Sequence, residues 1–157
     1  MYSFKKLDNN DEFLLLYNKK QIKFKRTVKT AQRLQSLDSE ARFRVIQKIS
    51  EMGYTIDNNP FIVEKQEGSK TIRDESNFNY LIEQEKQFAM AEIIADIVKD
   101  TIGMEFDSLI LELGINPTDE KEIVKFTSDF IYIIKNGEVF GTKKTPSTND
   151  QVWNRKR

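Results

Sequence analysis

The sequence predicts a mainly α-helical fold, with about five helices in an elongated array and a short β-hairpin near the N-terminus. The strongest observation is the segment 76–102, which contains neither proline nor glycine and carries an apolar stripe at helical spacing. A second helical pattern lies near the end of the chain, and two short strand-like runs lie near its start. At 157 residues the chain fits one domain over 1–141, followed by a basic tail at 142–157 that is expected to be disordered.

The first predicted elements are a hairpin and two helices that cover it. An apolar run at 13–17 and a run at 21–26, in which Ile22 and Phe24 alternate with lysines, flank a polar turn and indicate a β-hairpin over 13–26. Two strands alone are marginally stable in water, so the apolar face of this hairpin needs a cover. The segments 27–37 and 38–53 predict two helices that supply it. The apolar residues of the second recur at helical spacing, and these are Phe43, Val45, Ile46, Ile49 and Met52.

The middle of the chain is expected to be irregular and then helical. The segment 54–74 contains Asn-Asn-Pro and Gly-Ser among few apolar residues, so it predicts a loop-rich region or an irregular second hairpin. The segment 76–102 predicts one long helix, which Gly103 ends. Two further helices are predicted after it, at 104–113 and from about residue 118 to residue 136.

The second half of the long helix carries more apolar surface than one neighbour can cover. A small domain has few elements for this task, so the sequence predicts a groove that binds an amphipathic helix of a partner or a second copy of the chain. The alternative is that the same residues simply form the core. The candidate partner-binding residues are Phe88, Met90, Ala91, Ile94, Val98, Met104, Phe106 and Ile110.

A basic segment near the N-terminus is the candidate for binding nucleic acid. It combines cations, which neutralise phosphates, with aromatic residues, which stack on bases. A simpler interpretation is that the lysines face water and protect an exposed edge strand from aggregation. The basic residues are Lys19, Lys20, Lys23, Lys25, Arg26, Lys29 and Arg33.

The residue types that common catalysis needs are missing, so we expect a binding protein and no enzyme. The chain has no Cys and no His, which excludes disulfides, thiolate ligands and the commonest general base. No glycine-rich phosphate loop or nucleophile elbow is present. Glu92, Asp96 and Asp100 share a helix face that could hold Mg²⁺, although a solvated acidic face is the simpler interpretation. No catalytic residue, metal site or cofactor is therefore predicted.

The charges of the chain are balanced in number but uneven in position. Residues 1–50 carry twelve Lys and Arg against five Asp and Glu, residues 51–140 carry eight against nineteen, and residues 141–157 carry five against one. The basic N-terminal part and the acidic middle part could drive head-to-tail self-association, or could neutralise each other within the fold. The absence of a signal peptide, of a long apolar run and of Cys predicts a cytoplasmic protein.

The order of these elements resembles that of a known family. The hairpin runs into Arg26-Thr27-Val28-Lys29-Thr30-Ala31, a helical body follows, and a late helix from Phe126 to Gly137 precedes the polar basic tail. This arrangement resembles the tail assembly chaperones of long-tailed bacteriophages, and it is most similar to the tape-measure chaperones of lactococcal siphophages. The resemblance covers most of the chain as architecture and lysine-rich composition.

The resemblance implies a function without catalysis. Such chaperones coat the long, helical, aggregation-prone tape measure protein until tail tube protein replaces them, and they often self-associate into a spiral. It implies for this chain that the apolar helix face binds tape measure protein in the host cytoplasm, that the basic tail recruits tail tube protein, and that copies of the chain associate. The alternative function is a nucleic-acid-binding regulatory protein that uses the basic segment Lys19–Arg33.

Overall fold

The computed structural model describes residues 1–8, 11–55 and 58–141. Within these ranges lie five helices and two antiparallel sheets, so the prediction of a mainly α-helical array was wrong and the chain is an α+β protein. The elements in chain order are β1 (Tyr2–Lys6), β2 (Glu12–Tyr17), β3 (Lys20–Lys25), α1 (Val28–Gln35), α2 (Leu37–Glu51), β4 (Val63–Glu67), β5 (Lys70–Asp74), α3 (Ser76–Ile102), α4 (Phe106–Glu112) and α5 (Glu120–Asn136).

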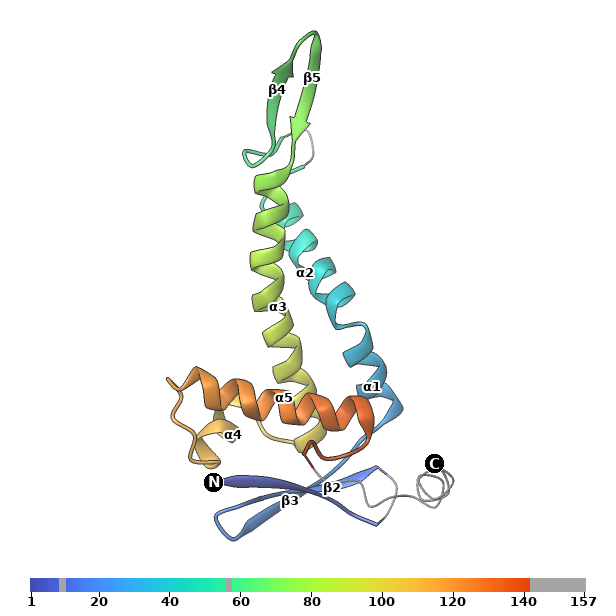
Figure 1. Cartoon of the computed structure of the whole chain (residues 1–157), viewed down its shortest axis with the longest axis vertical. Helices are drawn as coiled ribbons and strands as arrows, with labels where there is room; N and C mark the ends of the chain where they lie inside the picture. The colour runs from blue at the N-terminus through green and yellow to red at the C-terminus, as the bar shows by residue number, and fades with distance from the viewer. Residues whose placement is uncertain (9–10, 56–57, 142–157) are drawn as a thin grey trace, which may run out of the picture.

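The elements form a base and a stalk. Figure 1 shows the three-stranded sheet at one end, with α5 lying across it and α4 beside α5. Helices α2 and α3 extend from this base side by side as the stalk, and the hairpin of β4 and β5 lies at the far end of the stalk. None of the helices in the described part of the chain is long and apolar enough to span a membrane.

The N-terminal sheet contains the predicted hairpin and one strand more. Strands β2 and β3 pair antiparallel, and β1 adds to the other side of β2. The turn between β2 and β3 has positive φ angles at Asn18 (44°) and Lys19 (62°), which is the backbone of a two-residue hairpin turn. Strand β1 was missed because only Tyr2 and Phe4 alternate in it, and so short a pattern gives little signal on its own.

One face of this sheet is covered by aromatic packing against α5. The rings of Phe13 and Phe24, which are cross-strand neighbours, stack with 5.6 Å between centroids. Phe4 of β1 lies 5.7 Å from Phe126 of α5, and Phe24 lies 6.1 Å from Phe130. These side chains fix α5 across the sheet, because each aromatic pair adds to the free energy of burying its apolar area.

The stalk is held by one buried stripe from each helix. On α2 the buried residues are Ala41, Val45 and Ile49, four residues apart, and they face α3. Phe43 and Ile46 of the predicted apolar pattern are 67% and 47% exposed, because the helical rotation turns their side chains away from the side of Ala41. Met52, directly after the helix, is 58% exposed. Helix α3 has the predicted bounds and ends at Gly103, whose φ of 88° is the left-handed conformation that favours glycine.

The segment 54–74 contains a second hairpin that few sequence signals mark. Strands β4 and β5 pair antiparallel around Gly68 and Ser69, so of the two predicted alternatives the hairpin is the one present. Its strands consist mainly of charged and polar residues, with Val63 and Ile72 as the apolar exceptions. Nine of the ten strand residues are exposed, so no core face produced the alternation by which strands are usually recognised. The predicted disordered tail at 142–157 lies outside the described residues.

Candidate protein-binding surface

The structure divides the predicted partner-binding residues into three groups. Two belong to the hydrophobic core, and these are Val98 and Ile110. Four are half-buried and pack against that core, and these are Met90, Ile94, Met104 and Phe106. Two are exposed, and these are Phe88 and Ala91. For Val98 and Ile110 the alternative interpretation as core residues is therefore the right one, because the base covers this end of α3.

Above the base, α3 presents an uncharged surface on the side that faces away from α2. The buried residues Ile82, Ala89 and Ile93 mark the side toward α2, and a rotation of about 100° per residue places a second set opposite them. We call this second set the α3 stripe: Tyr80, Gln84, Gln87, Phe88, Ala91, Ile94 and Ala95. Ile94 and Ala95 are half-buried and the other five are exposed. No residue of the stripe is charged, although 32% of the chain is.

Phe88 stands at the border of the α3 stripe, beside a shallow hollow between α2 and α3. The hollow has a volume of about 180 Å³, and its apolar lining includes Val45, Phe88 and Ala89. Lys48 of α2 lies 3.5 Å from Glu85 of α3 at one end of this region. Phe88 is 67% exposed although it forms part of this lining, so most of its side chain is available to a partner.

The acidic face of α3 that was considered for Mg²⁺ is occupied by arginines of the same chain. The Arg33 guanidinium of α1 lies 3.6 Å from Asp96, 3.4 Å from Asp100 and 3.4 Å from Glu40 of α2. Hydrogen bonding to Glu40 is the main cause that raises the pKa of Arg33 above its ordinary value. The described ranges contain no group of three or more acidic side chains that could hold a metal ion. Asp96 and Asp100 therefore join three helices instead of forming a cation site.

Arg26 also has a structural role, at the C-terminal end of α5. Its Nε donates to the carbonyl oxygen of Ile134 at 2.6 Å, and its Nη2 donates to that of Lys135 at 3.2 Å. Its Nη1 lies 3.1 Å from the carboxylate of Asp11. The carbonyl groups at the end of a helix lack partners and carry a partial negative charge, so this cation stabilises α5 and fixes β3 to it.

The five lysines of the predicted basic patch remain on the surface. Lys23 lies 2.8 Å from Glu12 and Lys20 lies 3.7 Å from Glu112, so these two are neutralised within the chain. Lys19, Lys25 and Lys29 are exposed. The basic patch is consequently smaller than the sequence predicts, because Arg26 and Arg33 hold the helices and two of the lysines are paired.

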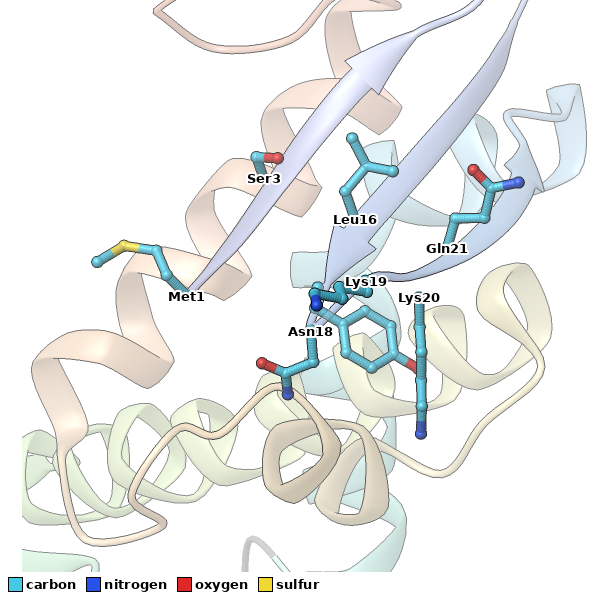
Figure 2. A pocket seen from close by; sticks show the side chains of 8 residues that line it. Met1, Ser3, Leu16, Asn18, Lys19, Lys20 and Gln21 are labelled. Carbon is cyan, nitrogen blue, oxygen red and sulfur yellow. The ribbon is translucent and has the colours of Figure 1, made fainter.

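The solvent face of the three-stranded sheet lacks the aromatic rings that a nucleic-acid surface needs. Its cross-strand rows run Lys5, Leu14, Lys23 and then Ser3, Leu16, Gln21. Figure 2 shows Leu16 with Ser3 and Gln21 around a hollow of about 400 Å³, which Lys19 and Lys20 also line. The rings of Phe4, Phe13 and Phe24 lie on the opposite face, in contact with one another or with α5. Bases would find no stacking surface on these strands.

Sequence reasoning missed the α3 stripe as a surface, although its signal was present. The apolar residues of α3 were recognised, but the absence of Asp, Glu, Lys and Arg from one side of the helix between Tyr80 and Ala95 was not. On exposed helix faces charged residues are the rule, so an uncharged exposed face is the more informative pattern. Comparison with protein-family models, with curated proteins and with solved structures finds no match for the chain.

Proposed function

We propose that this chain is a tail assembly chaperone, which binds the helical tape measure protein of a long-tailed bacteriophage and keeps it soluble in the host cytoplasm. The single observation that carries the proposal is the α3 stripe. It is an exposed, uncharged and partly apolar helix surface on a stalk that stands apart from the base. A surface of this kind suits the apolar face of an amphipathic helix, which would pack against α3 side by side.

The composition of the α3 stripe fits a helix better than it fits other partners. Ala91 and Ala95 are small, so a second helix can approach α3 closely, at an axial distance of roughly 8–10 Å. Phe88 and Tyr80 provide aromatic area that is exposed in the free chain and would be buried in the complex. No charged residue of the stripe would have to lose its water, which removes a large unfavourable contribution to binding.

The proposal also accounts for a surface that is only moderately apolar. Gln84 and Gln87 lie among the apolar residues of the stripe, and burying an amide without a hydrogen-bond partner costs free energy, so the stripe binds an apolar helix face less tightly than a fully apolar surface would. A chaperone that tail tube protein later displaces needs binding that is reversible, and a mixed surface supplies it. Self-association of the chain and recruitment of tail tube protein belong to the same proposal.

Co-expression with a tape measure protein of a long-tailed phage tests the proposal. We expect the wild-type chain to bring that protein into the soluble fraction as a complex. Phe88→Glu should abolish the complex, because an ion would be buried against an apolar helix face. Ile94→Asp is a poorer choice, because Ile94 packs against the core and its loss would destabilise the fold.

Phe43→Glu is the matched control. Phe43 and Phe88 are both 67% exposed, and both lie on helices of the stalk, but Phe43 lies on the side of α2 that faces away from α3. The Phe43→Glu chain should keep the complex. Equal loss of the complex in both variants, or retention of it by a folded Phe88→Glu chain, would refute the assignment of the α3 stripe.

A further inference from the structure

The hairpin at the tip of the stalk is an isolated two-stranded sheet. Nine of its ten strand residues are exposed, which means that neither face packs against the rest of the described chain. A two-stranded hairpin without a covered face is marginally stable in water, and added strands stabilise it. Both of its edges also offer backbone N–H and C=O groups of the kind that pair with another strand.

We propose that β5 pairs antiparallel with β5 of a second copy, so that the two hairpins form one four-stranded sheet between stalk tips. The inference concerns association of the chain with itself, and it holds whether or not the α3 stripe binds a client. The occupant is a second copy because β5 is complementary to itself about Ile72. In antiparallel pairing centred on that residue, Ile72 lies opposite Ile72, and Lys70 lies opposite Asp74 on both sides of it.

The backbone of β5 is in the right phase for this register. The pair Glu67 and Lys70 closes a two-residue turn, and in such hairpins the closing pair is hydrogen-bonded. Hydrogen-bonded and non-hydrogen-bonded pairs alternate from there along the hairpin, so Ile72 and Lys65 form a hydrogen-bonded pair. The backbone N–H and C=O of Ile72 therefore point toward β4, whereas those of Thr71 point outward to the free edge. The backbone N–H and C=O of Thr71 would hydrogen-bond to β5 of the second copy. The two Ile72 residues would form a non-hydrogen-bonded pair, in which the side chains lie closer together.

Charge distinguishes the β5 edge from the β4 edge. The proposed pairing produces the cross-strand row Glu67, Lys70, Asp74 and Val63, with the last two from the second copy, so Lys70 lies between two carboxylates and no like charges are neighbours in the row. The equivalent pairing of two β4 strands would be centred on Lys65 and would place two like charges opposite each other. The exposed Ile72 is thus covered only in the β5 arrangement.

The association is expected to be weak, because two strands of five residues bury far less than the roughly 1,000 Å² of a stable interface. Disulfide trapping is therefore the appropriate test, and the chain contains no Cys that would interfere. In the proposed register two Ile72→Cys residues face each other with about 4.5 Å between Cα atoms, which is within the range that a disulfide spans. Full-length Ile72→Cys should form covalent dimers under mild oxidation.

Gln66→Cys is the control, because it is exposed in the same hairpin but lies on β4 and on the opposite face. Ile72→Cys should cross-link about tenfold faster than Gln66→Cys, whose rate measures random collision. Adding Thr71→Pro to Ile72→Cys should remove the difference, since proline takes away an outward N–H that the hairpin itself does not use. Equal rates for the two single-cysteine chains, or unchanged trapping with Thr71→Pro, would overturn the proposal.

Discussion

Replacement of Phe88 by alanine distinguishes a contribution of this side chain to the stability of the fold from a contribution to client binding. Full burial of a phenylalanine side chain contributes about 1.5–3 kcal/mol. Phe88 is 67% exposed in the free chain, so its present contacts account for about one third of that amount. Phe88→Ala should therefore lower the free energy of unfolding by no more than about 1 kcal/mol. The exposed two thirds would be buried by a client helix, so the same change should weaken client binding by about 1–2 kcal/mol, or about 5- to 30-fold in Kd.

Two measurements on the same preparation provide the comparison. Urea denaturation followed by circular dichroism gives the free energy of unfolding, and calorimetric titration with a helical segment of tape measure protein gives Kd. Ile93→Ala is the opposite case, because Ile93 is fully buried and its truncation should cost about 2–5 kcal/mol of stability. If Phe88→Ala cost as much stability as Ile93→Ala, Phe88 would belong to the core and the reasoning about the α3 stripe would fail.

Three further changes test the surroundings of the site. Arg33→Ala removes the cation between Glu40, Asp96 and Asp100. Because these groups are partly solvated, urea denaturation should show a loss of stability of about 1 kcal/mol, and a smaller loss at high salt. A loss that does not depend on salt would contradict the electrostatic explanation. Thr27→Ala removes the capping box with Thr30 at the start of α1, and the same assay should show a loss of about 1 kcal/mol; an unchanged midpoint would mean that the cap adds nothing. Hydrogen bonds from Lys65 and then Ser76 hold the pKa of Asp74 well below its usual value. The contribution of Asp74 to the stability of the hairpin is therefore present above about pH 4, the ordinary pKa of Asp, and is lost as the pH falls below that. Amide exchange in β4 and β5 should accelerate over that range before the core opens, and simultaneous opening of hairpin and core would contradict this role of Asp74.

The helices of the body were predictable because their signals are local. Helix α3 begins and ends where the sequence predicts, since no Pro or Gly interrupts 76–102 and Gly103 follows. Helix α5 is similar, because Asp119 caps it and its side chain accepts a hydrogen bond from the backbone N–H of Glu122. In both cases the residues that fix the boundary lie next to it in the sequence.

The fold class was not predictable in the same way, because the missing strands have little pattern of their own. Strand β1 is defined by pairing with β2 and by the contact of Phe4 with Phe126, which is far away in the sequence. Strands β4 and β5 have no buried face, so hydrophobic alternation could not reveal them. One omitted strand in the N-terminal sheet, together with a hairpin that was predicted only as an alternative to a loop, changes a helical prediction into an α+β protein.

The candidate site was predicted in part, for a related reason. The sequence shows that α3 has excess apolar surface, but which side of it the base covers depends on where α4 and α5 lie. Val98 and Ile110 are buried in the core by that packing, whereas Phe88 and Ala91 stay exposed. Likewise the roles of Arg26 and Arg33 depend on partners more than sixty residues away, Ile134 and Asp100. From composition alone both arginines were predicted to belong to a basic patch.

The most direct test of the central claim is a hydrogen-exchange map of the chain, free and in complex with a tape measure protein. The α3 stripe predicts that slowed exchange on complex formation is concentrated in residues 80–95, with the outer side of α2 and the strands β2 and β3 unchanged. Slowed exchange centred on residues 19–26, or no change anywhere in α3, would contradict the claim that this helix surface holds the client.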